Sequence, residues 1–190
     1  KTKYKMWMPK KEFDFFEDQV WRVFAGMGAK IMNRNSTNTI LPFGENKSKK
    51  LDVFAVFDDV IIICECKCAE KQNTPSRSTF NKDIEELVSI RNGAEDFLKK
   101  AYPGKRIVYV FATKNYKIGE TTLKKLEESE IFLLEYDKVE YYLYLTESLG
   151  FASKFQFYAE IFSGEKISDK TVKVNAIKKI NPDKSTTYTF

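Results

Sequence analysis

Histidine is absent from the 190 residues of this sequence. The absence excludes catalytic triads with a histidine base, histidine-ligated zinc sites and histidine general bases. Hydrolytic chemistry in this chain would therefore depend on carboxylates, on lysine and on a metal ion taken up from solution.

Cysteine is also scarce, with three residues at positions 64, 66 and 68. An odd number at such close spacing does not suit a disulfide scaffold and indicates a reducing, cytoplasmic compartment. On a strand all three would face one side without a fourth zinc ligand. We therefore expect Cys64 and Cys66 to be small buried apolar residues.

Membrane and nucleotide-binding signals are missing as well. No apolar run reaches the roughly 18 residues that a membrane helix needs, and there is no signal peptide, so we expect no membrane association. The stretch 99–106 contains glycine and lysine but lacks the spacing of a P-loop, so we expect no nucleotide cofactor. Because the chain begins at Lys1 and stops at Phe190 in a strand-like run, we expect a piece of a longer protein.

The sequence does contain enough apolar material for a packed domain. Hydrophobic residues make up 43% and aromatic residues 15% of the chain, which excludes a disordered segment. The net charge of +5 is a mild basic excess that suits a polyanionic partner without requiring one.

The apolar pattern predicts a helix, three strands, a second helix, a strand, a short third helix and a last strand. In chain order these segments are 9–29, 30–43, 51–57, 60–68, 81–101, 106–113, 120–129 and 131–135. In the second helix, the residues expected to face inward are Ile84, Leu87, Val88 and Phe97. A hairpin followed by strand–helix alternation indicates an α/β fold with a central mixed sheet flanked by helices.

The character of the chain changes after about residue 137. One or two aromatic-rich helices are expected there, broken near Gly150, and two strands are expected within 171–190. We therefore predict a core over 1–136 and a helical extension over 137–167. The segment 168–190 would form a C-terminal hairpin or begin a following domain.

Two acids and a lysine are predicted to meet at one end of an otherwise apolar hairpin. If Asp58 and Asp59 form a two-residue turn, the commonest length, Asp52 lies opposite Glu65. Because side chains alternate along a strand, Asp52, Glu65 and Lys67 then share one face. Opposed residues have Cβ atoms about 4.5–5.5 Å apart, where two like charges destabilise a sheet.

A divalent cation would account for this arrangement, because Mg²⁺ commonly binds one or two carboxylates together with phosphate oxygens. Lys67 could then reach a metal-bound water or the attacked phosphate. The alternative is that Glu65 and Lys67 form a local ion pair and that Asp52 only ends a strand, since short motifs recur by chance. The apolar strands and the opposed carboxylates favour a metal–phosphate site.

These residues resemble the PD-(D/E)xK, or restriction-endonuclease-like, nuclease family, whose core is an αβββαβ unit. The resemblance covers about residues 10–135. Asp52 matches the acid at the start of the second core strand, and Glu65-Cys66-Lys67 matches the "ExK". Leu51 stands where many members have proline. Many members carry a glutamate on the first helix, and "FFEDQV" offers Glu17 for that role.

The resemblance implies DNA cleavage with Mg²⁺ or Mn²⁺. Asp52, Glu65 and the backbone carbonyl of Cys66 would bind the metal. Lys67 would orient or deprotonate a water, or stabilise charge on the phosphorus. Glu17 would hold a second metal ion or its water. Candidates for contacts to the DNA backbone are Lys82, Arg91 and Lys114, for each of which a role in solubility is the alternative.

The chain from residue 141 onward more weakly resembles the lead-in to the DGQHR domain, which some proteins carry behind a nuclease-like module. We therefore predict a metal-dependent endonuclease domain acting on double-stranded DNA in restriction or phage defence. The alternative is an inactive nuclease-fold module that binds DNA or a protein partner. Because cutting both strands generally needs two active sites, the prediction includes a homodimer.

Overall fold

The computed structural model describes residues 10–33, 40–44, 47–76 and 78–163. The strands expected within 171–190 lie outside the described residues, as do the last residues of the predicted helical extension. The division into a core, an extension and a following segment stays a prediction.

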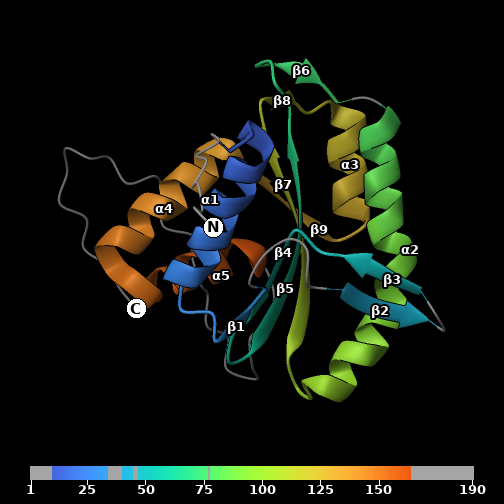
Figure 1. Cartoon of the computed structure of the whole chain (residues 1–190), viewed down its shortest axis with the longest axis vertical. Helices are drawn as coiled ribbons and strands as arrows, with labels where there is room; N and C mark the ends of the chain where they lie inside the picture. The colour runs from blue at the N-terminus through green and yellow to red at the C-terminus, as the bar shows by residue number, and fades with distance from the viewer. Residues whose placement is uncertain (1–9, 34–39, 45–46, 77, 164–190) are drawn as a thin grey trace, which may run out of the picture.

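A five-stranded mixed sheet forms the centre of the fold, with strand order β1-β4-β5-β7-β9 (Figure 1). β1 and β4 run antiparallel to their neighbours, whereas β5, β7 and β9 are parallel. The strands are β1 (Ile31–Met32), β4 (Val53–Val56), β5 (Val60–Cys68), β7 (Arg106–Lys114) and β9 (Ile131–Glu135). A hairpin followed by parallel strands is the α/β arrangement that the sequence predicts.

Helices cover both faces of this sheet (Figure 1). One face packs against α1 (Glu12–Gly26), α4 (Tyr136–Leu149) and α5 (Lys154–Ile161), with a 3₁₀ turn at Gly150–Ser153. The other face packs against α2 (Ser78–Ala101) and α3 (Glu120–Glu128). The order α1, β1, β4, β5, α2, β7 contains the predicted αβββαβ core, and the break of the aromatic-rich helices at Gly150 is confirmed.

The inward face of α2 differs in part from the prediction. Ile84 and Leu87 are fully buried, but Val88 and Phe97 are 42% and 45% exposed. The other apolar residues that α2 buries are Phe80, Ile90, Ala94 and Leu98. Successive helical residues are rotated by about 100°, so Val88 and Phe97 lie at the two edges of the buried stripe that is centred on Leu87 and Ala94. None of the described helices is long and apolar enough to cross a membrane.

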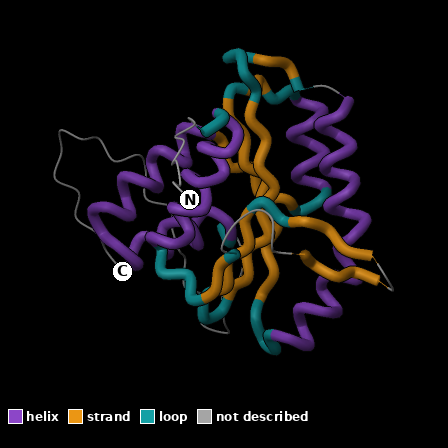
Figure 2. The backbone as a smooth tube through the Cα atoms, viewed as in Figure 1, coloured by secondary structure: helices purple, strands orange, loops and turns teal. Residues whose placement is uncertain are grey.

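Two small strand pairs lie outside the central sheet (Figure 2). β2 (Ile40–Gly44) and β3 (Lys47–Lys50) form an antiparallel hairpin, and β2 lies against α2. β6 (Thr74–Pro75) pairs in parallel with β8 (Tyr116–Lys117). The sequence predicts one irregular strand over 30–43, whereas the structure divides this region between β1 and β2 and places the basic residues 47–50 in a strand.

Gly26 allows α1 to approach α4 closely, and we expect Gly26→Ala to lower the free energy of unfolding. A Cβ at this position would lie 2.7 Å from the Cβ of Thr146, which is fixed to the backbone of α4. Overpacking of this kind costs about 1–3 kcal/mol. Urea unfolding would measure the loss, with Gly119→Ala as the control because a Cβ there meets no atom within 4 Å. Equal stability of the two variants would contradict the prediction.

Candidate active site

The β4–β5 hairpin has the predicted register. Val53 pairs with Cys64, Phe54 with Ile63, Ala55 with Ile62 and Val56 with Ile61. This register is the one that a two-residue turn at Asp58 and Asp59 requires, and it places Asp52 opposite Glu65 at the next position. Alternation is confirmed too, because Val53 and Cys64 pack under α1 whereas Phe54 and Ile63 pack under α2.

Asn33 fixes the backbone at the start of β4. Its buried side-chain amide donates a hydrogen bond to the carbonyl oxygen of Asp52 (2.8 Å), and its Oδ1 accepts one from the backbone N–H of Phe54 (2.9 Å). Trp21 on α1 donates through Nε1 to the carbonyl oxygen of Asn33 (2.6 Å). Asp52 is therefore held by the chain before β2 and, through Trp21, by the first helix.

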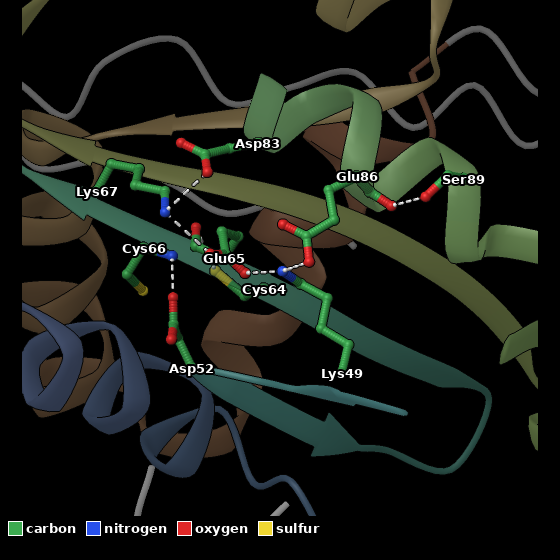
Figure 3. A network of polar contacts seen from close by, with 9 residues as sticks. All are labelled: Lys49, Asp52, Cys64, Glu65, Cys66, Lys67, Asp83, Glu86 and Ser89. Atoms are coloured by element: carbon green, nitrogen blue, oxygen red, sulfur yellow. Dashed lines mark hydrogen bonds and ion pairs between the residues drawn. The ribbon is translucent and has the colours of Figure 1, made fainter. Parts of the chain in front are cut away.

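The carboxylate of Asp52 reaches across to β5 (Figure 3). Its Oδ2 accepts a hydrogen bond from the backbone N–H of Cys66 at 2.8 Å. The carbonyl of Val60 also faces β4, since it accepts from Phe57 N at 2.8 Å. In an extended strand the N–H and C=O of one residue point to the same neighbouring strand. The carbonyl of Cys66 therefore faces the side on which Asp52 lies, just outside the paired residues of β4.

Glu65 is 7% exposed and lies between two lysines (Figure 3). Lys67 Nζ is 3.1 Å from Oε1, and Lys49 Nζ, from β3, is 3.5 Å from Oε2. Glu65 Oε2 is buried and has no hydrogen-bond partner among the described residues. The Glu65–Lys67 ion pair of the alternative interpretation is thus present, and a second lysine lies on the other side of the carboxylate.

Two acids of α2 extend this network (Figure 3). Asp83 Oδ1 is 3.4 Å from Lys67 Nζ, and Glu86 Oε1 is 3.1 Å from Lys49 Nζ. The charges therefore alternate along a line from Asp83 through Lys67, Glu65 and Lys49 to Glu86. Three separate elements, α2, β5 and β3, contribute to it.

Burial and mutual repulsion act on the acids of the site. Burial raises the pKa of Asp52, although the Cys66 N–H and the nearby lysines oppose the shift. Burial and the charge of Asp52 raise the pKa of Glu65, again against Lys49 and Lys67. The two lysines therefore do not fully offset the cost of burying both carboxylates, and an additional cation would relieve it.

Glu17 belongs to the same electrostatic cluster. Its pKa is raised from 4.5 to about 7, first by burial and next by the charge of Asp52, with a smaller contribution from Glu65. Glu17 on α1 is therefore within electrostatic range of the two acids of the hairpin.

Lys67 is held in its charged form. Burial lowers the pKa of Lys67, but the charges of Glu65 and Asp83 outweigh burial and leave this pKa above its usual value. The side chain is therefore an ammonium group at neutral pH in the chain as described. Such a group can stabilise negative charge or orient a water but cannot take a proton.

The donor set of the site fits a divalent cation. Among the described residues, no three acidic or cysteine side chains are gathered closely enough to hold a metal ion by themselves. Two carboxylates and a backbone carbonyl remain, which is a common set for Mg²⁺ with water and phosphate completing the shell. The buried Oε2 of Glu65, which lacks a hydrogen bond, is the atom that a cation would serve best.

The three predicted DNA contacts lie in different surroundings. Lys82 is exposed on α2, next to Asp83. Arg91 stacks over Tyr109 at 4.6 Å and donates to the carbonyl of Ser129. Lys114 is 9% exposed, pairs with Glu12 and lies 4.0 Å from the ring centre of Tyr136. Of the three, Lys82 is the one with an exposed side chain.

The sequence patterns did not indicate a role for Asn33, Lys49, Asp83 or Glu86. Lys49 belongs to the basic run at 47–50, which has no local sign of burial. Asp83 and Glu86 are three residues apart on one helix face, and this spacing was the available signal that both point the same way.

Replacing Glu17 with glutamine should stabilise the protein above neutral pH. Because the folded-state pKa is raised from 4.5 to about 7, the neutral carboxyl favours folding below pH 4.5, and that contribution is lost as the pH rises to about 7. Glutamine stays neutral, so the variant should be on the order of 1 kcal/mol more stable at pH 8, after allowance for solvent screening.

Urea unfolding at pH 4.5 and pH 8 tests this prediction, with Glu127→Gln as the matched control because Glu127 is an exposed residue of α3. The control should be near wild type at both pH values. A Glu17→Gln variant less stable than wild type at pH 8 would contradict the electrostatic account.

Comparison with known proteins gives distant similarities. No family model matches the sequence, and no curated protein matches it. Protein VC1899 from Vibrio cholerae is 16% identical with a TM-score of 0.46, over 73% of this chain and 32% of that one. This chain thus spans about a third of the Vibrio protein.

Two smaller proteins are similar over more of their own length. An XisH family protein from Nostoc punctiforme is 15% identical with a TM-score of 0.41, over 67% of this chain and 93% of that one. The small subunit of a heterodimeric restriction endonuclease is 15% identical with a TM-score of 0.39, over 78% and 88%. The fold class therefore rests on the strand order and directions described above.

Proposed function

We propose that this chain is a metal-dependent endonuclease domain that hydrolyses phosphodiester bonds of DNA. The observation that carries the proposal is the pair of carboxylates, half-buried Asp52 and buried Glu65, at opposed positions of the β4–β5 hairpin. The Lys67 ammonium lies beside Glu65. Folding does not require acids at these positions, whereas phosphodiester hydrolysis with a metal ion bound from solution requires them as ligands.

Asp52, Glu65 and the carbonyl of Cys66 would hold Mg²⁺ or Mn²⁺. When bound, the metal would polarise the phosphodiester and lower the pKa of a coordinated water. The Lys67 ammonium would lie beside the phosphate and stabilise the negative charge that develops there. The raised pKa of Lys67 favours an ammonium group that would orient the attacking water.

Glu17 and Lys82 would serve neighbouring roles. Glu17 would hold a second cation or the water bound to one, because the negative charges of Asp52 and Glu65 act on it and raise its pKa. Lys82, exposed beside Asp83, would contact a backbone phosphate of double-stranded DNA. The proposal includes a homodimer that acts in a cytoplasmic restriction or phage-defence system. The DGQHR-like segment would follow the nuclease domain in the chain.

The second candidate function is a nuclease-fold module that binds DNA or a protein partner without cutting. It is favoured by the ion pairs that Lys49 and Lys67 make with Glu65, because they partly neutralise the carboxylate without a metal. The two functions differ in whether cleavage depends on the acids of the hairpin.

We expect the wild-type protein to nick supercoiled plasmid with Mg²⁺ or Mn²⁺ and to lose this activity with EDTA. Asp52→Asn keeps the size of the side chain but removes a metal-binding charge, and Lys67→Ala removes the ammonium. Each should lower the nicking rate by about 100-fold or more. Gel analysis of plasmid over time measures the rate.

Lys71→Ala, an exposed lysine four residues beyond Lys67, is the matched control and should cleave at the wild-type rate. DNA binding without nicking, equal in wild type and both site variants, would replace the enzyme with the binding module. Nicking that survives in both site variants would assign the activity to a contaminant or another site.

A further inference from the structure

Lys49 is a largely buried cation that the proposed reaction does not use. Its side chain is 10% exposed, although it comes from a short strand, β3, outside the central sheet. Burying a lysine is unfavourable unless its charge is paired. Its two partners are both acids, Glu65 of the site and Glu86 of α2.

The two lysines beside Glu65 are bound differently. Lys67 is 3.1 Å from Oε1 and is held from its other side by Asp83. Lys49 is 3.5 Å from Oε2, the buried oxygen without a hydrogen bond, and is closer to Glu86 at 3.1 Å. Lys49 therefore makes the weaker contact with Glu65 and could remain paired with Glu86 if that contact were lost.

A metal ion and Lys49 would compete for the same oxygen. A divalent cation bound to Glu65 would repel an ammonium group about 3.5 Å from that carboxylate. Release of Lys49 from Glu65 would leave it paired with Glu86, whose side chain is 54% exposed and can follow it. The lysine would thus not become an unpaired buried charge.

We propose that Lys49 is an internal competitor for the metal. It neutralises Glu65 in the metal-free chain, is displaced when a divalent cation binds, and so sets the metal concentration at which the site fills. This inference rests on the proposed function, because it needs a cation at Asp52 and Glu65. Glu86 acts through Lys49 by determining how readily the lysine leaves Glu65.

Two substitutions should change metal affinity in opposite directions. Lys49→Met removes the competitor and should tighten Mn²⁺ binding by about tenfold or more. Glu86→Gln leaves Lys49 with Glu65 as its remaining partner in the network and should weaken Mn²⁺ binding by about two- to fivefold. Calorimetric titration of the DNA-free chain with Mn²⁺ measures both effects without any cleavage assay.

The double variant separates competition from general electrostatics. If Glu86 acts through Lys49, adding Glu86→Gln to Lys49→Met changes the affinity no further. If Glu86 attracts the metal only by its charge, the same weakening appears in both backgrounds. Lys50→Met is the charge-matched control, because the exposed Lys50 on β3 acts on Asp52 through its charge. This replacement should tighten binding by less than about threefold.

The outcomes distinguish this inference from the proposed function. Wild type and Lys49→Met binding equally, with binding lost in Asp52→Asn, would overturn the competitor and keep the metal site. Binding unchanged by Asp52→Asn, or absent in wild type and Lys49→Met alike, would overturn both. Binding by Lys49→Met alone would support the competitor. Circular dichroism melts of each variant, with Lys49→Gln as a second replacement, would establish that the chains are folded.

Discussion

The pairing register of β4 with β5 is the constraint on which the candidate site depends. Side chains alternate along a strand, so a slip of one residue would move Asp52 to the α1 face and separate it from Glu65. The register is held by apolar burial on both faces and by the turn. Lys105 Nζ donates to the carbonyls of Phe57 and Asp58, and Lys30 pairs with the Asp58 carboxylate. The same packing that stabilises the core thus brings the acids together.

The charged residues of the candidate site lower the stability of this hairpin. Apolar strands favour folding, whereas Asp52 and Glu65 at their end have raised pKa values because burial opposes their charge. Lys49 and Lys67 reduce that cost but leave the Glu65 Oε2 without a hydrogen bond. A cluster of acids that is incompletely satisfied in the folded chain is typical of a site arranged for a ligand that carries positive charge.

The features that follow from periodicity within one element could be predicted from the sequence. The Asp58-Asp59 turn and the alternation of side chains were enough to obtain the β4–β5 register and the shared face of Asp52, Glu65 and Lys67. The inward face of α2 was harder, because residue type alone does not show where the apolar stripe ends. Val88 and Phe97 are apolar but lie at the edges of that stripe. The sheet therefore covers Leu87 and Ala94, whereas Val88 and Phe97 stay exposed.

The contacts between elements could not be predicted in this way. Lys49, Glu65 and Glu86 are separated by 16 and 21 residues, and their meeting depends on the β2–β3 hairpin lying against α2 above β5. In the sequence Lys49 is one of several lysines in a basic run, which normally indicates a solvated surface. Burial reverses that interpretation, because a lysine with 10% exposure between two acids has a defined charge to balance. The composition of a lysine-rich stretch therefore predicts the sign of the charge at the surface. Tertiary packing decides which of these lysines belongs to a site.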